Sequence, residues 1–118
     1  VIKRSKPRET LDELHRVSAL EITKGLVDAK IIKGSASAAM LAGKYKPFYM
    51  HRVGHWLGID VHDTSPVIDP RTRDFLSAAN RPLEPGCVFT VEPGIYIDPR
   101  DEGVPAEFRG IGVRIEND

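Results

Sequence analysis

The chain has 118 residues, of which 41% are hydrophobic and 29% are charged, a balance typical of a soluble protein with a real core. Lysine plus arginine and aspartate plus glutamate both number 17, so the formal net charge is zero. This argues against a nucleic-acid or anionic-membrane binder, which needs a basic excess. No apolar run approaches the ~18 residues of a membrane span, so we expect neither nucleic acid nor membrane as a partner.

The two ends of the chain and its one cysteine bear on its origin. The sequence starts VIKRSKPRET, with no initiator methionine or signal-peptide pattern. It ends GVRIEND, inside an expected strand, so we expect a piece of a longer protein. Cys87 has no second cysteine to pair with and lies in an apolar stretch. It is therefore expected to be a buried free thiol in a cytoplasmic protein.

Two helices are expected in the first third of the chain. Residues 8–30 predict a long helix with Thr10 or an earlier polar residue near its start, stopped by Gly34. Residues 35–43 predict a short second helix, capped by Ser35 and stopped at Gly43. In the first helix, one sector at about 100° per residue is apolar. Its members are Leu11, Leu14, Ile22, Leu26 and Ala29.

Residues 45–85 show no periodicity, contain several glycines and prolines, and carry three of the four histidines. A long loop of this kind in a compact domain is usually functional or disordered. Its aromatic residues argue against disorder, so a functional loop is expected. His15, on the first helix, is interpreted as a structural residue.

Two strands are expected after this loop, residues 87–97 (CVFTVEPGIYI) and residues 111–118 (IGVRIEND). Because side chains alternate along a strand, each strand has one face that carries a glutamate and one apolar face. In the first strand, Val88, Thr90 and Glu92 share a face opposite Cys87, Phe89 and Val91; in the second, Arg114 and Glu116 lie opposite Val113 and Ile115.

A glutamate within an apolar strand must be exposed, paired or bound to a cation, because burying a bare carboxylate is costly. For an ordinary strand, a solvent-facing edge is the simplest explanation. Glu92 is less easily explained in this way, because Pro93 holds it extended and Gly94 permits a sharp bend after it. Arg114 is expected either to pair with Glu116 or to orient it.

The segment HRVGHWLGIDVHD, residues 51–63, holds the remaining histidines. His51 and His55 are four residues apart, as in H-E-x-x-H, but position 52 is arginine and the nearby glycines argue against a helix. Imidazole with carboxylates suits Mn²⁺, Co²⁺, Fe²⁺ or Zn²⁺ in a hydrolytic centre. No serine elbow, CxxC pair, P-loop or dinucleotide fingerprint is present. Spacing alone thus predicts a metal-assisted hydrolase with histidine and glutamate ligands.

Three ordered segments, PFYMHRVGHWLGIDVHD, LEPGCVFTVEPGIYI and RGIGVRIEND, resemble the Xaa-Pro aminopeptidase (aminopeptidase P) family. Prolidase, methionine aminopeptidase and creatinase are relatives with the same pita-bread fold. The resemblance covers roughly residues 9–118. It implies an α+β chain with helices on a curved, mostly antiparallel sheet, in which residues 1–118 form the C-terminal part of the catalytic domain.

The resemblance also implies a role for each matching residue. His55, Glu92 and Glu116 correspond to metal ligands, and Glu92 also to the base that acts on the metal-bound water. His62 corresponds to the catalytic histidine that contacts the substrate carbonyl. His51 corresponds to a histidine of the substrate pocket, and Arg114 to the arginine beside the bridging glutamate Glu116.

The activity implied is release of the N-terminal residue from peptides with proline in second position, by attack of a metal-bound hydroxide. Two divalent ions are implied, with Mn²⁺ expected and Co²⁺, Zn²⁺ or Fe²⁺ as alternatives. A homo-oligomer is expected for the intact protein. Prolidase activity on Xaa-Pro dipeptides and a non-catalytic pita-bread binding module remain the two alternatives.

The chain departs from the family pattern at two points. The family centre has five protein ligands, and two of them are aspartates of a strand hairpin upstream of residue 1. None of the four aspartates in and after the histidine segment matches that hairpin, so these 118 residues alone are expected to be inactive. Arg52 stands where many members have glycine, which is expected to alter pocket access or to mark a prolidase-like subgroup. The four aspartates are Asp60, Asp63, Asp69 and Asp74.

Overall fold

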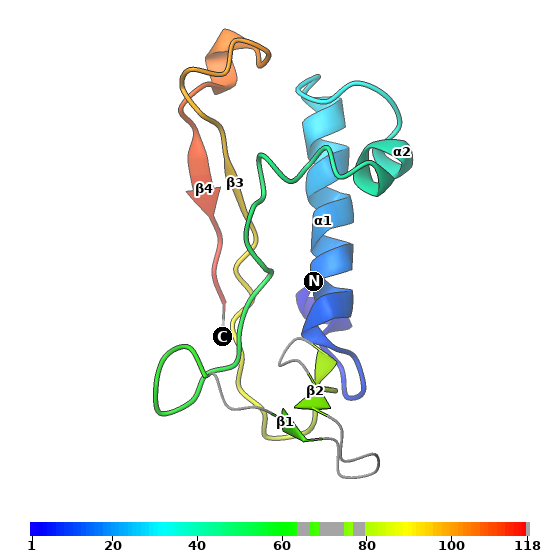
Figure 1. The fold of residues 1–118 in the computed structure, drawn as a ribbon, viewed down its shortest axis with the longest axis vertical. Coiled ribbons are helices and arrows are strands. Elements are labelled where there is room, and N and C mark those ends of the chain that lie inside the picture. The colour runs from blue at the N-terminus through cyan, green and yellow to red at the C-terminus, as the bar shows by residue number, and fades with distance from the viewer. Residues whose placement is uncertain (64–66, 69–74, 77–79, 118) are drawn as a thin grey trace.

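The computed structural model describes residues 1–63, 67–68, 75–76 and 80–117. The molecule is elongated, 50 × 29 × 24 Å, and its long helix α1 lies alongside extended segments that run the length of the molecule (Figure 1). Asp69 and Asp74 lie outside the described residues. No described helix is long and apolar enough to cross a membrane. The elements are η1 (Ile2–Arg4), α1 (Leu11–Asp28), α2 (Ala36–Leu41), β1 (Val67–Ile68), β2 (Phe75–Leu76), β3 (Gly94–Tyr96), η3 (Ala106–Phe108) and β4 (Gly112–Arg114).

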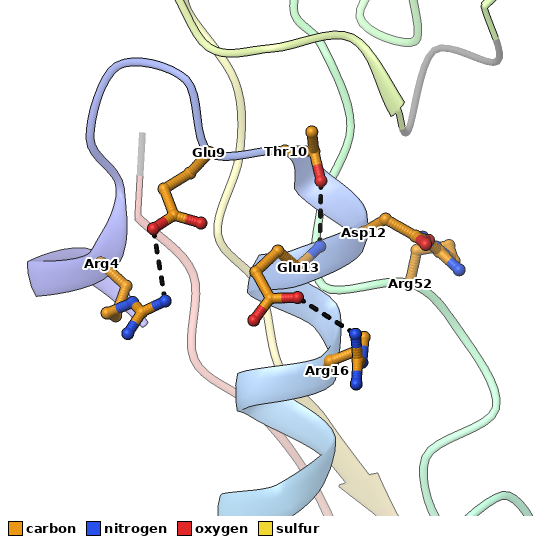
Figure 2. Close-up of polar contacts among 7 residues, drawn as sticks. All are labelled: Arg4, Glu9, Thr10, Asp12, Glu13, Arg16 and Arg52. Carbon is orange, nitrogen blue, oxygen red and sulfur yellow. Dashed lines mark hydrogen bonds and ion pairs between the residues drawn. The ribbon is translucent and has the colours of Figure 1, made fainter.

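Of the polar residues expected near the start of α1, Thr10 is the cap. The Thr10 hydroxyl accepts a hydrogen bond from the Glu13 N–H at 3.1 Å (Figure 2), which satisfies one of the unpaired amides of the first turn. Asp12 and Glu13 place negative charge at the positive end of the helix dipole. Glu13 also pairs with Arg16 at 3.4 Å, an exposed contact that adds little.

The end of α1 differs from the prediction. The helix stops at Asp28, and Lys30 takes the left-handed conformation with φ +59°, whereas Gly34 (φ +107°) lies beyond in the connection. The amides of Ile31 and Ile32 fold back to the Leu26 carbonyl. This return buries Ile32 against Leu26, and that burial explains why a non-glycine residue adopts the strained backbone. Ser35 caps α2 as expected and accepts from the Ala38 N–H at 3.3 Å.

The expected strand 87–97 forms, but as an interrupted ladder. Its regular part is β3, which pairs antiparallel with β4. The same register continues to a bridge between Val91 and Asn117, and the Ile115 N–H donates to the Pro93 carbonyl at 3.1 Å. Pro93 has no N–H with which to donate a second hydrogen bond to the opposite strand, so the ladder is broken at this residue.

Residues 53–57 pair with the other edge of the same segment. The Glu92 N–H donates to the Val53 carbonyl at 2.6 Å and the Thr90 N–H to the His55 carbonyl at 2.9 Å. An antiparallel bridge joins Trp56 to Phe89. The segment 88–97 therefore has extended neighbours on both edges, residues 53–57 along 88–92 and residues 111–117 along 91–97. Part of the expected loop 45–85 is thus paired backbone. The loop also contains the antiparallel pair β1–β2.

The sheet is therefore less regular than the curved sheet expected from the sequence. Every described pairing is antiparallel, but the named strands form two separate two-stranded sheets, β1–β2 and β3–β4. The outer strand is open to solvent, and Val113 and Ile115 are 51% and 67% exposed. The apolar face that Val113 and Ile115 form on this strand is therefore exposed, not buried.

Two apolar clusters hold α1 to the extended segments. Leu11 and Leu14 belong to the first cluster and Leu26 to the second, as predicted for the helix face. Ile22 only borders the second cluster, and Ala29 lies beyond the end of α1 in neither cluster. Cys87 packs against the first cluster but is only partly buried, which corrects the expected buried thiol. The first cluster is Leu11, Leu14, Val53, Trp56, Leu83 and Val91; the second is Leu26, Ile32, Ala39, Phe48, Ile97 and Val104.

His15 lies on α1 with its ring 5.2 Å from that of Tyr49. Burial lowers its pKa from 6.5, and Arg52 lowers it further, against the opposing effect of Asp12. Below pH 6.5 the unfolded chain binds this proton before the folded chain does, so stability falls as the pH falls. We expect His15→Gln to reduce the loss of unfolding free energy between about pH 7.5 and 5.5, measured by urea denaturation. Equal losses in both proteins would contradict this expectation.

Candidate functional site

Glu92 is the centre of the described polar groups, and it is only 8% exposed. Its Oε1 accepts the Thr90 hydroxyl at 2.7 Å and lies 3.3 Å from His55 Nε2. Its Oε2 pairs with Arg114 Nη1 at 3.2 Å. The carboxylate thus has a donor on each oxygen, the nearby Thr90 hydroxyl on Oε1 and the guanidinium of the distant Arg114 on Oε2. Such pairing compensates the burial of the charge.

Arg114 reaches Glu92 from β4 and is itself positioned by an aromatic residue. Its Nε donates to the Tyr96 hydroxyl at 2.6 Å, and its guanidinium carbon lies 5.6 Å from the centre of the Tyr96 ring. From the sequence we expected Arg114 to act on Glu116. The contact that the structure gives is to Glu92, so Arg114 steadies the first of the two strand glutamates.

His55 presents one ring nitrogen toward the carboxylate. Its Nδ1 is 3.0 Å from the Trp56 carbonyl oxygen, which can only accept, so Nδ1 carries the proton. In the neutral ring, Nε2 then directs a lone pair toward Glu92 Oε1 at 3.3 Å. Two facing acceptors repel each other unless a proton or a cation lies between them. A backbone carbonyl that receives the second ring nitrogen is the usual support of a metal-ligating histidine.

His62 and Glu116 lie at the edge of this group. The His62 ring is exposed and edge-on to that of His55, with 4.3 Å between centroids. The strand register places Glu116 directly opposite Glu92, because Gly94 faces Arg114 and Val91 faces Asn117. Directly opposite residues share a face of the sheet, and like charges there repel unless compensated.

The side chains do not, however, converge into a complete metal centre. Among residues 1–63, 67–68, 75–76 and 80–117, no three or more His, Cys, Asp or Glu groups are close enough to hold an ion. Glu116 is exposed. His55 and Glu92 have the right donor chemistry and face each other, and Glu116 lies on the same face. These residues therefore fit part of a divalent metal site and do not complete one.

His51 lies apart from this group, in an aromatic neighbourhood. Its ring is 5.0 Å from Tyr49 and 5.5 Å from Tyr96, edge-on to both, and its Nδ1 bonds the Arg52 carbonyl at 2.7 Å. Together with His15 it lines a shallow pocket beside α1. The Arg52 side chain forms an ion pair with Asp12 of α1, and Figure 2 shows the two side chains side by side.

Three residues near Glu92 were not singled out from the sequence, namely Thr90, Tyr96 and Gly54. The alternation of the strand puts Thr90 on the face of Glu92, and the spacing of two residues brings their side chains together. Tyr96 holds Arg114 across strands, which depends on a register that the sequence does not show. A Cβ on Gly54 would lie 1.8 Å from the Thr90 carbonyl oxygen, and this approach also depends on pairing between distant segments.

The chain matches the model of Metallopeptidase family M24 over residues 1–118. It is 43% identical over 120 residues to the Xaa-Pro aminopeptidase of Escherichia coli (strain K12), an alignment that covers 93% of this chain and 25% of the relative. The chain thus spans about a quarter of the length of that relative.

Solved structures show the same likeness. The aminopeptidase PepP of Pseudomonas aeruginosa is 44% identical with a TM-score of 0.80, covering 93% of this chain and 23% of that one. Zinc-substituted E. coli aminopeptidase P in complex with product is 41% identical with a TM-score of 0.81, covering 97% and 24%. These likenesses confirm that the chain has part of the pita-bread fold.

Proposed function

The chain belongs to metallopeptidase family M24, and from this premise we propose that the protein containing it is a metal-dependent Xaa-Pro aminopeptidase. Residues 1–118 would form the C-terminal part of its catalytic domain. The observation that carries the proposal is the buried carboxylate of Glu92, which faces His55 Nε2 at 3.3 Å in a chain 43% identical to a Xaa-Pro aminopeptidase. Members of this family bind metal ions.

His55, Glu92 and Glu116 are the residues that would hold divalent metal, with Mn²⁺ preferred and Co²⁺, Zn²⁺ or Fe²⁺ as alternatives. When bound, the metal pair supplies Lewis acidity and lowers the pKa of a water. The carboxylate of Glu92 is proposed as the base that takes up a proton, while its Oε1 faces His55. Arg114 keeps the other oxygen, Oε2, in place.

His62 and His51 are proposed to act on the peptide. His62 is exposed beside His55, where its imidazole can donate a hydrogen bond to the substrate carbonyl oxygen as negative charge develops. His51 lies between two tyrosines and forms part of the wall of the substrate pocket. Proline in second position has no N–H, so its recognition depends on shape and apolar contact.

We place the intact protein in the cytoplasm as a homo-oligomer.

The proposal is tested with the tripeptide Arg-Pro-Pro and added Mn²⁺. We expect turnover by the full-length protein and at most a trace by the 118-residue chain, which supplies only part of the donor set. Robust turnover by the 118 residues would contradict the incomplete site. Cleavage of dipeptides but not tripeptides by the full-length protein would show a prolidase instead. A well-folded full-length protein that contains no metal on elemental analysis would show a binding module.

A further inference from the structure

Thr90 contacts two of the three candidate ligands, His55 and Glu92, and is 2% exposed. Its hydroxyl oxygen is 3.0 Å from the His55 backbone nitrogen and 2.7 Å from Glu92 Oε1. The second distance is typical of a strong hydroxyl–carboxylate bond. One buried hydroxyl therefore contacts both the backbone that carries His55 and the side chain of Glu92.

The direction of both bonds follows from chemistry. A backbone amide can only donate, so the Thr90 oxygen accepts from the His55 N–H. The hydroxyl has one proton, and the carboxylate can only accept, so this proton is directed to Glu92 Oε1. The backbone N–H of Thr90 meanwhile donates to the His55 carbonyl. Thr90 thus fixes the position of His55 twice and that of Glu92 once.

We propose that Thr90 is a positioning residue that fixes Glu92 Oε1 opposite His55 Nε2 for a divalent cation. The inference rests on the proposed function. The hydroxyl restrains the rotation of the carboxylate and occupies one lone pair of Oε1, which leaves the second lone pair directed to the same space as His55 Nε2. Supporting partners of this kind orient metal ligands, and their loss typically lowers metal affinity about 10- to 100-fold.

The test compares three variants of the full-length protein. Thr90→Val keeps the shape and removes the two hydrogen bonds of the hydroxyl, to the His55 N–H and to Glu92 Oε1. Thr90→Ser keeps the hydroxyl. Thr23→Val is the matched control, because Thr23 is also fully buried and its hydroxyl donates at 2.6 Å to the Ala19 carbonyl within α1, away from Glu92. The Mn²⁺ affinity of each metal-free protein is measured by calorimetry. The kcat and KM of each protein are measured with Arg-Pro-Pro as the substrate.

We expect Thr90→Val to weaken Mn²⁺ binding about 10- to 100-fold and to lower kcat more than it changes KM. Thr90→Ser and Thr23→Val should both stay close to the wild type. A folded Thr90→Val protein with wild-type Mn²⁺ affinity and kcat would overturn the proposal, and so would equal losses in Thr23→Val.

Two further measurements keep the test decisive. If Thr90→Val does not fold, Thr90→Cys takes its place, because a thiol is a weaker donor than a hydroxyl; wild-type Mn²⁺ affinity in that variant would overturn the proposal. If the wild-type protein does not cleave Arg-Pro-Pro, the proposed function fails. The Mn²⁺ titration then still decides whether Thr90 positions the ligands.

Discussion

Gly54→Ala is expected to destabilise the protein by about 3 kcal/mol or more, at the upper end of the effects of overpacking. A Cβ at this position would lie 1.8 Å from the Thr90 carbonyl oxygen and 2.7 Å from its carbonyl carbon. Both are backbone atoms of the central extended segment, so a change of side-chain rotamer cannot relieve the clash. Separating residues 53–55 from 90–92 would break the bonds Glu92 N–H to Val53 O and Thr90 N–H to His55 O.

Gly25→Ala is the matched control. Gly25 lies within α1, is exposed, and has nothing within 4 Å of an added Cβ. There the same change should stabilise the protein by about 0.5–1 kcal/mol, because alanine loses less backbone entropy in a helix. Urea denaturation followed by far-UV circular dichroism measures both. Equal effects of the two substitutions would contradict the close approach at Gly54.

The contrast between these glycines shows which parts of the fold could be predicted from the sequence. The Ser35 cap and the start of α1 near Thr10 could be predicted because each depends on residues three positions away. The end of α1 was not, because Lys30 takes a glycine-like conformation in a turn that returns Ile32 to the core. Gly54 could be recognised as a break in periodicity. Its contact with Thr90 depends on pairing between distant residues.

In the candidate site, too, features set by nearby residues could be predicted and those set by pairing of distant residues could not. The unusual position of Glu92 within an apolar strand was visible in the sequence, and the structure buries it among compensating partners. Two residues of this network, one in contact with Glu92 and one in contact with Arg114, were not foreseen. Thr90 and Tyr96 are ordinary strand residues by type, and they gain a function only from their register with His55 and Arg114. The roles assigned to the six candidate site residues rest on the resemblance and stay predictions: His51, His55, His62, Glu92, Arg114 and Glu116.

Glu92→Gln in the full-length protein is expected to lower kcat on Arg-Pro-Pro about 1,000-fold, within the range for loss of a positioned acid–base group. A carboxylate accepts at both oxygens, whereas an amide offers one acceptor and one NH₂ donor. Arg114 has only donors, so the amide oxygen should turn toward it and the NH₂ toward Thr90 and His55. The Thr90 proton then loses its acceptor, and a positively polarised group replaces the oxygen that faced His55 Nε2.

The same geometry sets the control for this substitution. Glu84→Gln makes the identical change at an exposed position in the turn before residues 87–97, and it should leave both kcat and Mn²⁺ affinity unchanged. Glu92→Gln should also lower the free energy of unfolding by about 1–3 kcal/mol, since a buried donor is left without its acceptor. A protein that lost this stability and kept kcat within tenfold of the wild type would show that Glu92 is a structural residue. It would remove the carboxylate from the proposed chemistry while leaving its place in the fold intact.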